Sequence, residues 1–220
     1  FHESVDETNR NRTRAAMDDW SEVSGVIFVP RTSQSNYIEI INSGSVAGQP
    51  AGNWSFVGMV GGRQYLSMYN WSWHYIIMHE LAHALGFWHE QSRPDRDTYV
   101  SIQWANISES GKHNFNLRDT ASTVGSYDFA SIMHYDDYAF SSNGQQTIVA
   151  NAGYESFQDV MGNISYLSES DAAGMAHLYP IGEGGEAIEG DLPASAFAVD
   201  SDNFTYSIAS ADFTENIEEK

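Results

Sequence analysis

Two different spacings of hydrophobic residues along positions 1–180 predict both helices and short strands. In Thr8–Trp20, Arg12, Ala16 and Trp20 recur at intervals of four, which is typical of a helix. Several short runs rich in β-branched and aromatic residues are separated by Gly, Ser, Pro and Asn, and this pattern predicts a small sheet. These runs are Val26–Val29, Tyr37–Ile41, Ser55–Val60 and Tyr65–Tyr69.

Two later segments also have helical signals. Trp73–Leu85 is a helical run followed by Gly86, a residue typical of helix C-termini. Ser168 and Asp171 have the spacing of a capping box, which predicts a final helix that ends before Pro180. Regular patterns are sparse between positions 87 and 166. The order of helix, small sheet, central helix, irregular half and late helix predicts an α+β fold.

The charge excludes several classes of protein. The 220 residues include 10 Lys or Arg and 30 Asp or Glu, a net charge of −20. Because nucleic acids and anionic membranes are bound through basic clusters, we expect neither as a partner. The apolar runs are shorter than the roughly 18 residues of a membrane-spanning helix. The chain contains no cysteine, so we expect no disulfide and no thiol chemistry.

The composition changes near position 180. Residues 181–220 contain one basic and ten acidic residues, a net charge of −9 in a fifth of the length. We therefore expect a domain at 1–180, followed by an acidic, Gly-containing linker and tail at 181–220. Within this tail, apolar and polar residues alternate weakly over Phe197–Ile208. This pattern would suit a strand, and we interpret it as the possible start of another module.

The segment His79-Glu80-Leu81-Ala82-His83 contains the main candidate chemistry. At about 100° per residue, the two histidines lie about 40° apart on one helix face and one turn apart along it. Two imidazoles in this arrangement can share a Zn²⁺ ion. Glu80 is close enough to accept the proton of a water molecule at the metal, so it is predicted to be the general base.

A third histidine, His89, reaches the same metal only if the helix ends before it. In a continued helix, His89 would lie about 280° around the axis from His79 and about 15 Å along it. Gly86 lies between them, and glycine adopts a left-handed turn without steric cost. The spacing therefore predicts a helix end at Gly86 and a site formed by His79, His83 and His89. Four other histidines are not spaced so that they could share a metal ion, and we expect them to be structural or on the surface. They are His74, His113, His134 and His177.

Beyond these ligands, the sequence resembles the astacin family of metzincin zinc endopeptidases over residues 8–179. Glu90 directly follows the third histidine, and Arg93-Pro94-Asp95-Arg96-Asp97-Thr98-Tyr99-Val100 follows in turn. Ser131-Ile132-Met133-His134-Tyr135 resembles the family's Met-turn. The resemblance implies that Met133 packs below the metal and that Tyr135 is a metal ligand at rest that stabilises the oxyanion during turnover. It implies structural roles for Glu90 and Gly86.

The resemblance also implies a function. We expect a secreted enzyme that uses Zn²⁺ to hydrolyse peptide bonds in proteins or peptides, with Glu80 and Tyr135 as catalytic residues. A propeptide or inhibitor is expected as a partner, although none is visible in the sequence. The family usually has a strand before the first helix, and that strand is expected to be missing from the numbered chain.

One further departure from the family and two alternatives remain at this point. Most family members have two disulfides, whereas here Gly25, Asn53 and Trp71 stand at aligned cysteine positions and the fourth falls just past Tyr179. A gluzincin would share the first two histidines but take a later glutamate as its third ligand. A zinc-stabilised adhesion or recognition module could have the same fold without catalysing a reaction.

Overall fold

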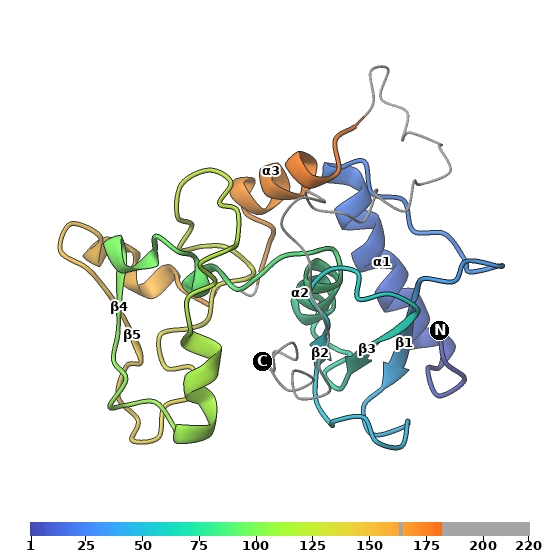
Figure 1. Ribbon diagram of the computed structural model, residues 1–220, viewed down its shortest axis with the longest axis horizontal. Coiled ribbons are helices and arrows are strands. Elements are labelled where there is room, and N and C mark those ends of the chain that lie inside the picture. Colours follow the sequence, from blue (N-terminus) through green and yellow to red (C-terminus); the bar gives the residue numbers. More distant parts are fainter. Residues whose placement is uncertain (163–164, 182–220) are drawn as a thin grey trace. The chain divides into compact units, whose positions relative to one another are not determined.

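The computed structural model describes residues 1–162 and 165–181, which belong to two compact units (Figure 1). Unit 1 is Phe1–Phe87 together with the described residues from Met175 onward, and unit 2 is Trp88–Gly174. The acidic tail and the strand expected at Phe197–Ile208 lie outside the described residues. None of the helices in the described part combines the length and apolar character needed to cross a membrane.

Helix α1 (Glu7–Val23) forms because one of its faces is buried. Asp6 caps its N-terminus by accepting a hydrogen bond from the Asn9 N–H, and Thr13, Ala16 and Trp20 are buried. This confirms the helix predicted at Thr8–Trp20 and extends it at both ends. Figure 1 shows α1 beside α2, and the Trp20 indole N–H donates to the Met78 carbonyl at 3.0 Å.

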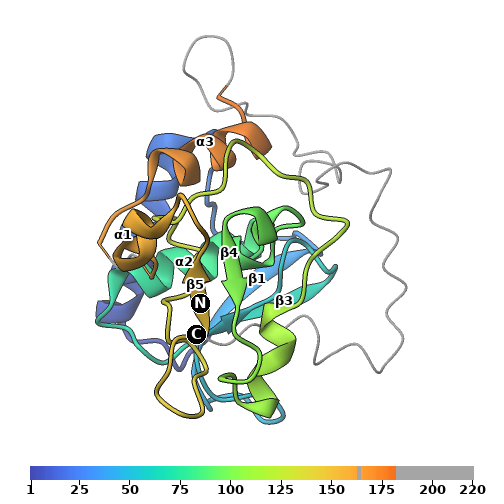
Figure 2. The same ribbon diagram turned by 90° about the vertical axis from the view of Figure 1, so that its left-hand side faces the viewer.

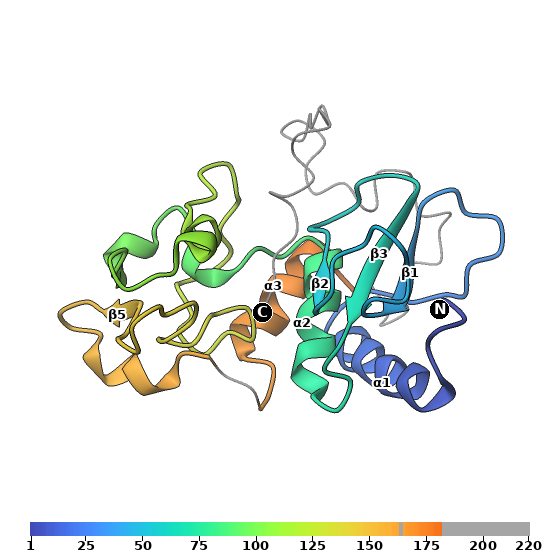
Figure 3. The ribbon, with the colours of Figure 1, turned by 90° about the horizontal axis from the view of Figure 1, so that it is seen from below.

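The sheet of unit 1 contains three strands in the order β1-β3-β2. Strand β1 (Tyr37–Asn42) is parallel to β3 (Arg63–Met68), and β2 (Trp54–Ser55) is antiparallel to β3. Figure 3 shows β1 and β3 side by side, with β2 and α2 at the other side of β3. Two of the predicted strands are therefore confirmed with small shifts of their ends.

The other two predicted strands need correction. Val26–Val29 forms no strand, and Ile27 and Val29 are exposed at 46% and 63%. Ser55–Val60 is strand only at its first residue, because the chain then turns and the Gly58 N–H donates to the His83 carbonyl of α2 at 2.8 Å. β-rich composition therefore produced strands only where a neighbouring strand was available.

Helix α2 (His74–Ala84) confirms the predicted central helix and its end. The Gly86 N–H donates to the His83 carbonyl, and the Phe87 N–H donates to the Ala82 carbonyl. These two bonds form a Schellman motif, and Gly86 has the positive φ of 111° that the motif requires. The chain consequently leaves the helix axis directly after the second histidine.

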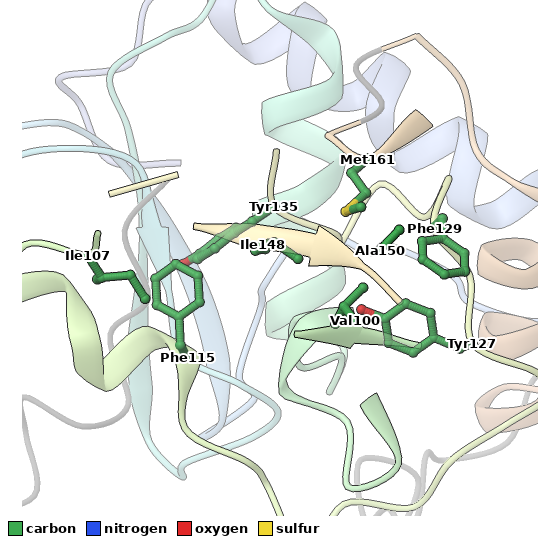
Figure 4. Packing of buried hydrophobic residues seen from close by; sticks show 9 residues of the cluster. All are labelled: Val100, Ile107, Phe115, Tyr127, Phe129, Tyr135, Ile148, Ala150 and Met161. Carbon is green, nitrogen blue, oxygen red and sulfur yellow. The ribbon is translucent and has the colours of Figure 1, made fainter. Parts of the chain in front are cut away.

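Unit 2 has little regular structure. Its only strands within the described residues are the antiparallel pair β4 (Val100–Ile102) and β5 (Ile148–Ala150). Four short 3-10 helices lie between or beside them, at Glu90–Ser92, Arg96–Thr98, Glu109–Phe115 and Glu155–Val160. The core is a cluster rich in aromatic side chains packed around β4 and β5 (Figure 4).

The last helix, α3 (Glu169–Leu178), begins with the predicted capping box. The Ser168 hydroxyl accepts from the Asp171 N–H at 2.9 Å, and the Asp171 carboxylate accepts from the Ser168 N–H at 3.1 Å. After α3, the Tyr179 carbonyl accepts from the Gly25 N–H at 2.7 Å, next to the end of α1 (Figure 2). The observed elements confirm the predicted α+β class.

Candidate metal centre

Consecutive turns of α2 bring His79 and His83 together. Both side chains are fully buried, and their ring centroids are 4.6 Å apart with the ring planes nearly perpendicular. The Nδ1 atom of His83 lies 2.7 Å from the Phe87 carbonyl oxygen. Because a carbonyl only accepts, this nitrogen has the proton in a neutral ring, and Nε2 has the lone pair that a metal needs.

The turn at Gly86 brings the third predicted histidine to the other two. One potential ligand nitrogen from each of His79, His83 and His89 lies within 4.8 Å of the others, and all three residues are buried. The structure therefore brings together the complete predicted set. Three neutral imidazoles are a donor set of catalytic zinc sites, so the residues present fit Zn²⁺.

Glu80 follows the first histidine on α2 and is fully buried. Its carboxylate is therefore removed from bulk water. Burial of an acidic side chain is uncommon and is often found at functional sites.

Glu90 connects the third histidine to the turn that contains Met133. Its N–H donates to the Met133 carbonyl at 3.0 Å, and its carboxylate accepts from the Asp128 N–H at 2.8 Å and from Arg93 at 3.1 Å. Burial raises the pKa of Glu90 to about 7, although Arg93 and the Asp128 N–H oppose that rise. Glu90 thus links two segments of unit 2 through both its backbone and its side chain.

The turn at Met133 is held by a residue that sequence analysis assigned only to a helix cap. The Asp171 carboxylate accepts from the Ile132 N–H at 2.9 Å and from the Ser131 hydroxyl at 2.6 Å. Met133 itself is 1% exposed. The capping-box spacing was a signal for the local role of Asp171, but it contains no information about the contact with Ile132, 39 positions away.

Tyr135 lies beside the third histidine. Its side chain is 1% exposed, and its ring centroid is 4.3 Å from that of His89. Phe115 and Phe140 pack against the same ring at centroid distances of 5.7 and 5.6 Å. The structure therefore places Tyr135 next to one of the three predicted ligands.

Sequence analysis missed the residues that hold the backbone of Tyr135. The Tyr135 N–H donates to Oε1 of Gln91 at 3.1 Å, and its carbonyl oxygen lies 2.6 Å from Nδ1 of His134. The sequence predicts only that His134 is structural or on the surface, and no motif indicates Gln91. The one signal in the sequence for Gln91 is its position two residues after His89.

Comparisons with known proteins agree with this geometry. Residues 1–180 match the Astacin peptidase family. The chain is 38% identical over 172 residues to zinc metalloproteinase nas-6 of Caenorhabditis elegans, covering 74% of this chain and 46% of that protein. It is 43% identical over 141 residues to blastula protease 10 of Paracentrotus lividus, covering 61% of this chain and 24% of that protein. The chain thus spans less than half the length of these relatives.

A solved structure extends the similarity to three dimensions. High choriolytic enzyme 1, a hatching enzyme zinc-protease from Oryzias latipes, superposes with a TM-score of 0.72 at 34% identity. The match covers 81% of this chain and 86% of that one. The chain therefore belongs to the astacin family, and it has the family's α+β metzincin fold and a three-histidine group for its Zn²⁺ cofactor.

Proposed function

We propose that this protein is a zinc-dependent endopeptidase that hydrolyses peptide bonds in proteins or peptides. The observation that supports this most strongly is the buried group of His79, His83 and His89 in a chain of the astacin family. Glu80, which directly follows His79, is buried as well. The zinc-protease name of the solved relative supports the same class of reaction.

The three histidines would hold Zn²⁺, which when bound acts as a Lewis acid for the scissile carbonyl and lowers the pKa of water. Glu80 accepts a proton as water adds to the peptide carbonyl carbon. It then delivers this proton to the amide nitrogen as the C–N bond breaks. The products are a carboxylic acid and an amine, which become a carboxylate and an ammonium group when the acid's proton passes to the amine. Burial of Glu80 keeps bulk water from competing for either transfer.

Tyr135 is assigned the role of stabilising the negative charge that develops on the carbonyl oxygen. Its phenol is a hydrogen-bond donor in a buried position, where a donor is worth more than it is in water. Glu90 and Met133 would not contact the substrate. They fix the chain that contains His89, through the hydrogen bond between the Glu90 N–H and the Met133 carbonyl.

The setting of the enzyme is also part of the proposal. Residues 1–180 would form the catalytic domain, and the protein would act outside the cell on protein substrates, held inactive by a propeptide or inhibitor until needed. The absence of cysteine is compatible with secretion, since the hydrogen bonds described here do not depend on a redox state.

Glu80→Gln tests the proposal, with Glu22→Gln on the exposed face of α1 as the control. We expect kcat/KM on a denatured protein substrate to fall about 10²- to 10⁴-fold in Glu80→Gln, because the amide cannot accept the proton. Zinc content, measured by atomic absorption, should match that of wild type in both variants. Chelation should abolish wild-type activity, and added Zn²⁺ should restore it.

Three results would contradict parts of the proposal. Zinc loss in Glu80→Gln would contradict the role of a base. Unchanged zinc affinity in His89→Ala would favour a gluzincin-type ligand set. Absence of hydrolysis by folded, zinc-loaded wild-type protein would favour the non-catalytic recognition module.

A further inference from the structure

Hydrogen bonds hold the backbone of Tyr135 on both sides. The peptide group before it donates to Gln91, and the peptide group after it accepts from His134. Gln91 and His134 are both fully buried. Because the two peptide groups are fixed, the position of the phenol depends only on the side-chain torsions of Tyr135.

The contacts of His134 define its tautomer. Nδ1 lies 2.6 Å from the Tyr135 carbonyl oxygen, which can only accept, so Nδ1 has the proton. Nε2 lies 2.7 Å from the Tyr127 hydroxyl. In a neutral imidazole Nε2 is then the acceptor, and the Tyr127 hydroxyl is the donor.

The surroundings of this pair are aromatic and buried. Tyr127 is 7% exposed and stacks on Tyr99 at a centroid distance of 4.7 Å, and Phe129 packs edge-on against it. Figure 4 shows Tyr127 and Phe129 within the same buried cluster as Tyr135. The rings of Tyr127 and Phe129 also pack against the His134 ring, at centroid distances of 5.5 and 6.3 Å. Burial also raises the pKa of Tyr127 well above 10, so its hydroxyl keeps the proton that it donates.

We propose that Tyr127 and His134 are positioning residues for Tyr135. The Tyr127 hydroxyl fixes the orientation and tautomer of the His134 ring, and the ring then holds the Tyr135 carbonyl, so that the phenol is placed before the substrate arrives. A preorganised donor stabilises a transition state without reorganisation during the reaction. This inference rests on the proposed function, in which Tyr135 stabilises the oxyanion.

The kinetic test is Tyr127→Phe, which removes only the hydroxyl. Tyr154→Phe is the control, because the Tyr154 ring packs against Tyr99 and Phe129 in the same cluster. We expect kcat to fall about five- to tenfold in Tyr127→Phe, with KM within about twofold of wild type, since the loss affects the transition state and not substrate binding. Tyr154→Phe should keep the wild-type kcat. An unchanged kcat in Tyr127→Phe would overturn the proposal.

A pair of His134 variants separates the two hydrogen bonds of the ring. The amide nitrogen of His134→Asn takes the place of Nδ1 and can still donate to the Tyr135 carbonyl, whereas that of His134→Gln takes the place of Nε2. Both variants bury one amide, so their folding costs are matched. We expect His134→Asn to retain more of kcat than His134→Gln. Equal or reversed losses would overturn the role assigned to the bond with Tyr135.

Nuclear magnetic resonance of the metal-free protein provides a readout that does not depend on activity. Long-range ¹H–¹⁵N spectra should show His134 protonated at Nδ1 only, and the ¹³C-labelled Tyr135 ring should give one sharp set of signals. In Tyr127→Phe the Tyr135 signals should broaden or shift, and in Tyr154→Phe they should not. A proton on Nε2 in wild type, or unchanged Tyr135 signals in Tyr127→Phe, would overturn the inference. If wild type proved inactive, the proposed function would fail while these spectra still decided whether the pair positions Tyr135.

Discussion

The two units of this protein are stabilised in different ways. Unit 1 consists of two packed helices and a sheet, whose backbone groups bond mainly to one another. Unit 2 has two strands of three residues each and several short 3-10 helices among its described residues. There, polar side chains that are buried or half-buried bond to backbone groups of distant segments, and the clearest examples are Glu90, Gln91 and Asp171.

This difference shows how an irregular chain can present a defined site. A backbone without regular ladders still needs partners for its buried N–H and C=O groups, and side chains supply them here. Stability in unit 2 should therefore depend on a few polar residues, whereas in unit 1 it should be spread over many backbone bonds. The same bonds in unit 2 hold Met133 and Tyr135 in place.

The largest effect is expected at Asp171. Asp171→Ala removes the acceptor for the Ile132 N–H, the Ser168 N–H and the Ser131 hydroxyl, all of which are buried. We expect the free energy of unfolding to fall by about 3 kcal/mol. Each buried donor that is left without an acceptor costs about 1–3 kcal/mol, and removal of the desolvated carboxylate offsets part of this cost. Urea unfolding followed by tryptophan fluorescence measures the change.

Two variants control this prediction. Asp171→Asn keeps an oxygen for the two N–H groups and should lose only about 1 kcal/mol. Asp159→Ala, at an exposed position of the same unit, should change stability by less than about 0.5 kcal/mol. If Asp171→Ala were no worse than Asp159→Ala, the description of unit 2 as stabilised by buried side-chain acceptors would be wrong.

A smaller effect is expected in unit 1 at Asn53, one of the positions aligned with a family cysteine. Asn53 is 4% exposed and accepts from the N–H groups of Tyr69 and Asn70 at 2.7 and 2.9 Å. Asn53→Ala leaves both N–H groups without an acceptor. We expect the free energy of unfolding, measured by thermal or urea unfolding, to fall by about 2 kcal/mol. Asn36→Ala is the matched control, because the exposed Asn36 accepts from the Gly62 N–H where water can replace it. Equal losses in the two variants would contradict a special role for burial at Asn53.

The smallest effect concerns the pH dependence of stability. Burial raises the pKa of Asp171 above its ordinary value of 3.8, against three hydrogen bonds that favour the charged form. The folded protein therefore binds this proton more tightly than the unfolded chain does. The contribution of Asp171 to stability should decrease as pH rises from 3.8 through the folded-state pKa and stay constant above it.

Asp171→Asn does not titrate, so it isolates this contribution. The difference in unfolding free energy, wild type minus Asp171→Asn, should decrease through that window by at most about 1.4 kcal/mol per pH unit. Paired urea titrations across the window measure it. A difference that stays constant or increases with pH would show that the hydrogen bonds outweigh burial at this carboxylate.

The positions aligned with the family's cysteines show how the fold is maintained without disulfides. Gly25 donates to the Tyr179 carbonyl, and a side chain at Gly25 would clash, since an added Cβ would lie only 2.4 Å from the Pro180 carbonyl oxygen. Asn53 bonds to the segment just before Trp71. At both places hydrogen bonds join two segments that contain or adjoin these positions.

The sequence alone determined the features that depend on local spacing. Helices α1 and α2, the helix end at Gly86, the capping box at Ser168 and the three-histidine group follow from which residues lie three or four positions apart. Such patterns record the geometry of a single helix or turn, and so they can be seen without knowing what lies beside it.

Only the tertiary structure decided which distant segments meet. The Val26–Val29 segment resembles the other β-rich runs in composition, yet it forms no strand, since pairing depends on a neighbouring strand. The contacts of Gln91 with Tyr135 and of Asp171 with Ile132 span 44 and 39 positions. No period in the sequence predicts such contacts, because they depend on the path of an irregular backbone whose buried groups must find partners wherever the fold brings them.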